Sequence, residues 1–170
     1  MSKQGGDLMQ ISSVRPEELA SWERYHSTLL AFIRKYGSKR ITEDAYRSVL
    51  RLTPQSFAEP GTGIMQAVVW TEDGRRLAGV LCTAGYGKDL SAVVVHPLYR
   101  SRGIGTLLMK AQLEQMGQLN CKVALDNLAS LKMCFKAGLS AGGITTGPTG
   151  KPTLLLSGKP GDFEERSGSR

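Results

Sequence analysis

The feature that most constrains the fold is a strand, a basic turn and a helix in direct succession. Residues 90–95 form an apolar run that is typical of a buried strand. His96 and Pro97 end this run, because proline has no N–H to donate to a sheet ladder. Apolar residues with helical spacing then predict a helix over residues 103–116. A strand that leads through a tight turn into a helix predicts a fold that mixes α and β structure.

The turn itself has the composition of an anion-binding site. The first N–H groups of a helix have no intrahelical partner, and the helix dipole adds about half a positive charge there. Gly103 and Gly105 leave the backbone open to a bulky anion, and Arg100 and Arg102 add charge and fork-shaped donors. The sequence therefore predicts that phosphate groups bind at this helix start.

Other glycine-rich loops fit the chain less well. A dinucleotide-binding fingerprint would need a third glycine at position 108, where the chain has Leu108. A P-loop around residues 87–88 would need glycine at position 82 and serine or threonine at position 89, where Cys82 and Asp89 stand. An ordinary basic turn closed by glycine remains the alternative.

The rest of the chain predicts a mixed α/β architecture. Helix starts at Pro16 and Thr42 precede a three-stranded antiparallel meander with strands over residues 67–71, 77–83 and 90–95. After the helix over residues 103–116 come a strand over 121–125, a helix over 129–137 and a hairpin over 145–156. The passage from the third strand to residues 121–125 implies one parallel crossover in an otherwise antiparallel sheet flanked by helices.

The length of 170 residues suits one domain. We expect a flexible N-terminus over residues 1–10, one domain over 11–157 and a disordered tail over 158–170. No stretch reaches the about 20 apolar residues that a membrane span needs, and the N-terminus has no apolar core of the signal-peptide type. The sequence thus predicts a cytoplasmic protein without membrane contact.

The formal charge of +7 favours polyanions as binding partners, because a basic surface attracts negative charge. Nucleic acid and a multiply phosphorylated cofactor both qualify, but the chain shows neither aromatic-basic alternation nor zinc-finger spacing, which disfavours nucleic acid. The three cysteines include no CxxC pair, and the two histidines lie far apart. We therefore predict reduced thiols and no metal site.

Two blocks of the sequence resemble the GNAT superfamily of N-acetyltransferases. The motif Arg100-x-x-Gly103-x-Gly105, set between an apolar strand and a helix, is similar to motif A of that family. The segment from Asp126 to Leu139 is similar to the helix of its motif B, and the order of elements resembles the GNAT fold over roughly residues 10–157. The resemblance implies that acetyl-CoA is the cosubstrate and that its acetyl group passes directly to an amine of a small molecule or a protein.

The resemblance also assigns a cofactor site. The turn would hold the coenzyme A diphosphate through backbone N–H groups, and the strand would pair with the pantetheine arm and polarise the thioester carbonyl. Asn127 would contact the pantetheine, although asparagine also caps helices well. The implied cofactor-binding residues are Val93, Val94, Val95, Arg100, Ser101, Arg102, Gly103, Ile104, Gly105, Thr106, Asn127 and Ser130.

The residues for proton transfer are less clear. Many family members have a tyrosine as general acid where this chain has Cys134, and the reference thiol pKa of about 8.5 gives no independent support for that role. Packing is the alternative for Cys134. Asp89 is the candidate base, with a turn residue as the alternative, and His96 and Tyr86 are weaker candidates. An alternative function is therefore a non-catalytic acyl-CoA-binding regulatory module on the same fold, and a homodimer remains open.

Overall fold

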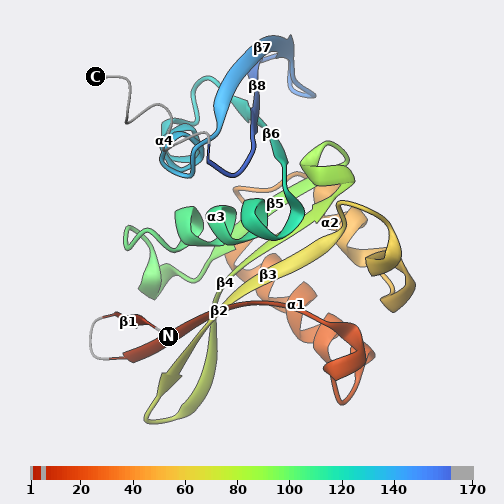
Figure 1. Ribbon diagram of the computed structural model, residues 1–170, viewed down its shortest axis with the longest axis vertical. Helices are drawn as coiled ribbons and strands as arrows, with labels where there is room; N and C mark the ends of the chain where they lie inside the picture. Colours follow the sequence, from red (N-terminus) through yellow and green to blue (C-terminus); the bar gives the residue numbers. More distant parts are fainter. Residues whose placement is uncertain (1, 5–6, 162–170) are drawn as a thin grey trace.

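Two antiparallel β-sheets and four α-helices form the fold, in a computed structural model that describes residues 2–4 and 7–161. The larger sheet has the strand order β1-β2-β3-β4-β5, and the smaller sheet has the order β6-β8-β7. Figure 1 shows the larger sheet in the lower half of the molecule and the smaller sheet, with α4 beside it, above. This arrangement confirms the predicted mixed α/β class.

The element bounds are as follows. The larger sheet contains β1 (Ser2–Gln4), β2 (Asp7–Ser13), β3 (Gly63–Thr71), β4 (Gly74–Ala84) and β5 (Leu90–Val95), and the smaller contains β6 (Leu119–Ala124), β7 (Ser140–Thr146) and β8 (Pro152–Gly158). The helices are α1 (Trp22–Gly37), α2 (Glu43–Leu50), α3 (Ile104–Met116) and α4 (Leu128–Lys136). Short 3-10 turns are η1 (Pro16–Glu18), η2 (Pro54–Ala58), η3 (Gly85–Gly87) and η4 (Pro97–Tyr99).

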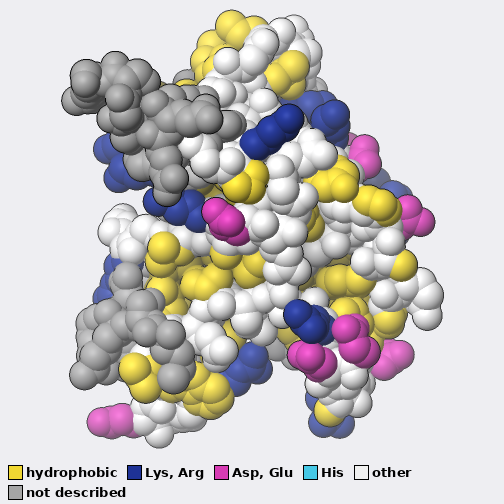
Figure 2. All heavy atoms as spheres, in the orientation of Figure 1, with side chains coloured by type: hydrophobic (Ala, Val, Ile, Leu, Met, Phe, Trp, Pro, Cys, Tyr) yellow, Lys and Arg dark blue, Asp and Glu magenta, His cyan; other side chains and the backbone are white. Residues whose placement is uncertain are grey.

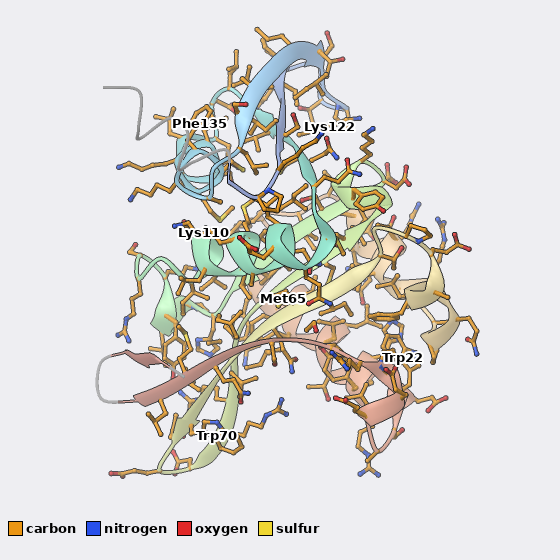
Figure 3. The ribbon with its side chains drawn as sticks, in the orientation of Figure 1. Trp22, Met65, Trp70, Lys110, Lys122 and Phe135 are labelled. Carbon is orange, nitrogen blue, oxygen red and sulfur yellow. The ribbon has the colours of Figure 1, made fainter. Side chains whose placement is uncertain are left out.

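Different helices bury the two faces of the larger sheet. On one face, α3 packs Leu108 against Leu81 and Met65, and Figure 3 shows Met65 beneath this helix. On the other face, Ile33 of α1 shares a core with Val94 of β5. Because side chains alternate along a strand, consecutive valines of β5 enter different cores.

Side-chain caps decide where the first two helices begin. The Ser21 hydroxyl accepts from the N–H of Arg24 and starts α1, whereas the predicted start at Pro16 yields only the turn η1. Thr42 caps α2 through the N–H of Ala45, as its sequence pattern predicts.

The N-terminal segment differs from the flexible stretch that we expected over residues 1–10. Strand β2 pairs with β3, with Met9 opposite Val69, and Met9 is fully buried under α3. The segment is too polar to give a clear strand pattern, so its partner strand decides its structure. Residues 1, 5 and 6 and residues 162–170 of the predicted tail lie outside the described residues.

Strands β5 and β6 belong to different sheets, and the expected parallel pairing between them is not among the described strand pairings. Near their first residues Ser91 Oγ of β5 lies 3.6 Å from Cys121 Sγ of β6, and the Asn120 side chain of β6 donates at 3.2 Å to the carbonyl of Tyr86, which belongs to η3 just before β5. We call the divergence of the two strands beyond these contacts the fork. Of the helices within the described residues, none has the length and hydropathy to cross a membrane.

Candidate functional site

The turn before α3 presents a helix N-terminus without a side-chain cap. Gly103 occupies the N-cap position in the left-handed region, with φ of 77°. A Cβ at this position would meet no atom within 4 Å, so the backbone faces open space. The first described N–H of the helix ladder is that of Leu107, which donates to the Gly103 carbonyl at 3.0 Å. The N–H groups of residues 104–106 precede it and have no intrahelical acceptor, which is the geometry that binds anions.

Gly105 serves a different purpose from the open approach that we expected. A Cβ at Gly105 would overlap the Met133 sulfur of α4. The absence of a side chain at Gly105 therefore lets α4 pack on the first turn of α3, and Gly103 alone of the two glycines leaves space for a ligand.

The guanidinium of Arg100 binds protein carbonyls, although we expected it to face an anion. Its Nε donates to the Val95 carbonyl at 3.0 Å and its Nη2 to the Tyr36 carbonyl at 2.9 Å. These bonds join the end of β5 to the last turn of α1, where carbonyls lack helical partners. Arg102 is exposed, with Cζ 5.5 Å from the centre of the Tyr99 ring, and it is the arginine of the turn that remains available to a ligand.

We therefore expect Arg100→Lys to lower stability by about 1–2 kcal/mol, because a lysine cannot donate to both carbonyls at once. This loss corresponds to a Tm lower by roughly 2–8 °C for a chain of this size. The matched variant Arg102→Ala should keep the Tm and weaken acetyl-CoA binding, which titration calorimetry measures. An Arg100→Lys protein with the parent Tm and a weakened affinity would contradict these assignments.

Strand β5 offers one free edge for an extended ligand. The His96 N–H donates to the Ala78 carbonyl at 2.8 Å, in the same register that places Val94 opposite Val80. The backbone N–H and C=O groups of successive residues point alternately to the two sides of a strand in an antiparallel ladder. Those of Val94 therefore point to β4, and those of Val93 and Val95 point to the fork. Val94 is also buried between β5 and α1, so the structure does not bring it to the site that the resemblance implied.

The second half of α4 packs on the first turn of α3 through the Met133 contact. Asn127 caps α4, because its Oδ1 accepts from the N–H of Ser130 at 3.2 Å. The capping role that we kept as the alternative is therefore present. It uses the amide oxygen and leaves the Nδ2 donors for a ligand.

Cys134 is fully buried in the core beneath α4. The hydrogen bond between its thiol and Cys121, and then its burial, raise the pKa of Cys134, so this thiol keeps its proton. Packing, the alternative to a role as general acid, accounts for its position. The sequence did not single out Cys121 and Ser91, because only the fold brings them together.

The candidate bases take part in local structure. Asp89 is exposed, and its carboxylate folds back over the turn η3, where a Cβ at Gly85 would overlap it. His96 Nδ1 accepts from the Leu98 N–H at 3.2 Å, and burial followed by nearby arginines and a lysine lowers its pKa. Tyr86 has a φ of 59°, and its carbonyl accepts from the Asn120 side chain. The structure thus supports the turn-residue alternative for Asp89.

A cavity of about 490 Å³ lies between η1, η2, the start of β3 and the C-terminal end of α3. Its lining includes Tyr86, the carboxylates Glu17 and Glu59, and the buried Gln112, whose Nε2 donates to Thr83 Oγ1 at 2.8 Å. Figure 2 shows basic and acidic side chains side by side at the lower right, in the region where Figure 1 draws the start of α1. Sequence reasoning missed this cavity, because its walls come from four separate segments.

Comparisons with known proteins agree with this architecture. Residues 21–139 match the model of the acetyltransferase (GNAT) family. A spermidine N-acetyltransferase SpeG variant from Vibrio cholerae superposes with a TM-score of 0.59 at 11% identity, over 94% of this chain and 98% of that one. The aminoglycoside acetyltransferase AAC(6')-Ib in complex with coenzyme A and kanamycin superposes with a TM-score of 0.58 at 17% identity, over 95% of this chain and 100% of that one. At such identities the likeness shows the fold, and no curated protein matches the chain.

Proposed function

Because the chain belongs to the acetyltransferase (GNAT) family, we propose that it transfers the acetyl group of acetyl-CoA directly to a primary amine of a small molecule or a protein. Membership confirms the prediction of an N-acetyltransferase that uses acetyl-CoA. The observation that carries the proposal is the uncapped, left-handed start of α3 at the end of β5. Location in the cytoplasm and a homodimer stay predictions.

In this proposal the diphosphate of acetyl-CoA binds the N–H groups of residues 104–106, with Arg102 beside them. The pantetheine arm extends along the free edge of β5, where the backbone groups of Val93 face the fork. An N–H on this edge donates to the thioester carbonyl, and this bond strengthens as the oxygen gains negative charge in the transition state. The Nδ2 group of Asn127 supplies a further hydrogen-bond donor to the pantetheine arm.

The cavity beside Tyr86 is the proposed acceptor site. A volume of about 490 Å³ is in the range of small-molecule sites. Tyr86 connects it to the base of the fork through its bond with Asn120, and Glu17 and Glu59 suit a positively charged amine. Two structural neighbours are described as spermidine and aminoglycoside acetyltransferases, which supports an amine acceptor.

The alternative is a non-catalytic acyl-CoA-binding module. It is favoured by the burial of Cys134 and by the position of Asp89, since the Cys134 thiol is enclosed in the core and the Asp89 carboxylate folds back over its own turn. This module would bind acetyl-CoA and release no coenzyme A in the presence of amines.

Thermal denaturation followed by a turnover assay tests the proposal. Acetyl-CoA at about 100 times its Kd should stabilise the protein by about 2.7 kcal/mol, which raises the Tm by roughly 5–10 °C. A panel of polyamines, aminoglycosides and peptide N-termini should then release coenzyme A thiol with at least one acceptor. A Tm shift without thiol release would select the non-catalytic module, and no shift at millimolar acetyl-CoA would contradict both functions.

A further inference from the structure

Three small side chains meet at the base of the fork. Ser91 of β5 donates through Oγ to the Sγ of Cys121 on β6 at 3.6 Å, and an interaction with the Cys134 thiol of α4 lowers the pKa of Cys121 and raises that of Cys134. Ser91 lies on the α3 face of the sheet, as Val93 does, because side chains two residues apart share a face. The Cys121 sulfur thus interacts with side chains from two other elements of the fold.

These interactions favour the ionised form of Cys121. The interaction with Cys134, and then the hydrogen bonds with Ser91 and with the backbone of Lys122, lower the pKa of Cys121, while burial acts in the opposite direction. No charged side chain among the described residues contributes to this shift, and the partner of Cys121 on β8 is the apolar Leu156. The side chain of Lys122, labelled on β6 in Figure 3, is exposed and belongs to the opposite face of the strand.

Cys121 also differs from the other two cysteines in access. It is partly exposed, whereas Cys82 and Cys134 are fully buried. Burial raises the pKa of Cys82 to about 12, and Cys82 belongs to the core beneath α1 and α2, on the far face of the sheet. Cys82 is therefore a suitable control thiol within the same chain.

The position of Cys121 matches the acyl end of the proposed cofactor. A diphosphate at the start of α3 lies by the C-terminal end of β5. An arm that follows the free edge of β5 from this end passes Val93 and reaches Ser91. Because Ser91 contacts Cys121, the thioester at the end of the arm comes next to the Cys121 sulfur.

We propose that Cys121 accepts the acetyl group of acetyl-CoA, so that the protein acetylates its own thiol when no amine is bound. This inference rests on the proposed acetyl-CoA site. The Cys121 thiolate attacks the thioester carbonyl carbon, a new carbon–sulfur bond forms, and the bond to the coenzyme A sulfur breaks. Coenzyme A leaves as a thiolate and takes up the proton that Cys121 gave to solvent, so no oxidant or reductant is needed. Cys134 and Ser91 position the nucleophile by interacting with its sulfur.

The test is incubation of the whole protein with acetyl-CoA without amine, followed by intact mass measurement and peptide mapping. We expect one acetyl group on Cys121, which neutral hydroxylamine removes because it is a thioester. Cys121→Ala should lack it and Cys82→Ala should keep it at the parent rate. Ser91→Ala should acquire it about 3–10-fold more slowly, as expected for the loss of one hydrogen bond to the sulfur. Acetylation of Cys121→Ala at the parent level would overturn the inference.

Alkylation by iodoacetamide without acetyl-CoA gives a second measurement that does not depend on acetyl transfer. Cys121 should react first of the three cysteines, and added coenzyme A should protect it. If acetyl-CoA binds and amines are acetylated while Cys121 gains no acetyl group, the inference is wrong and the proposed function stands. If coenzyme A neither binds nor protects Cys121, the proposed function fails, and the inference that rests on it fails too.

Discussion

Gly103→Glu should abolish acetyl-CoA binding in a protein that remains folded. The substitution places a carboxylate where the uncapped N–H groups of residues 104–106 and Arg102 are proposed to hold the diphosphate. The new side chain can bind these amides itself, since acidic groups suit a helix start, and it repels the phosphates. The stabilisation by acetyl-CoA, about 2.7 kcal/mol at 100 times the parent Kd, should therefore be lost. Differential scanning fluorimetry with and without acetyl-CoA measures this effect.

The other end of α3 supplies a matched control. Gly117 has a φ of 78°, against 77° for Gly103, and a Cβ would likewise meet no atom within 4 Å. Gly117→Glu therefore imposes a similar backbone strain, of about 1–2 kcal/mol, and adds the same charge at the far end of the helix. It should retain the acetyl-CoA response, and Gly103→Ala should also retain most of it. If Gly103→Glu binds acetyl-CoA as tightly as Gly117→Glu, the turn is not the diphosphate site.

Gly87→Ala should destabilise the protein more than an alanine at any open glycine. Gly87 has a φ of 95°, and a Cβ there would overlap the backbone carbonyl of Asn120. Left-handed strain adds about 1–2 kcal/mol and forced contact in a packed site about 1–3 kcal/mol, so we expect a loss of roughly 2–5 kcal/mol. The Tm should fall by on the order of 10 °C.

Comparison with Gly117→Ala separates the two causes of this loss. Both positions need a left-handed residue, but only Gly87 contacts another segment of the chain. The difference in free energy of unfolding between the two variants, measured by urea titration, reports the contact with Asn120. Because this contact is at the base of the fork, Gly87→Ala should also weaken the response to acetyl-CoA. Equal losses in both variants would show that the chain relaxes around the new methyl group.

The elements that the sequence predicted well are those with local signals. The apolar run of β5, the Thr42 cap and the periodic stripe of α3 each depend on residues close together in the chain, and the structure has all three. Strand β2 was missed because its partner is more than fifty residues away. The two separate sheets were missed for the same reason, since the sequence does not show which strands diverge.

The same distinction applies to the site. Gly103 could be predicted because a helix start and its left-handed cap are local features. The structural roles of Arg100 and Gly105 could not be predicted, because they depend on residues distant in sequence. Arg100 donates to the Tyr36 carbonyl, and Gly105 makes room for Met133. Cys121 drew no interpretation beyond a reduced thiol, because its environment comes from β5 and α4.

The bond from Arg100 to the Val95 carbonyl has a consequence for substrate choice. It occupies the outward acceptor nearest the turn, so an extended arm can accept from residue 95 but can exchange both bonds only with residues farther along the strand, the first of which is Val93. In the proposed binding mode the phosphates bind at the start of α3 and the amides of the arm pair with these backbone groups, so acetyl-CoA cannot shift along the strand in either direction. The proposed binding mode therefore predicts selection by the length of the acyl carrier: a truncated thioester can reach the diphosphate site or the carbonyl position, but not both together.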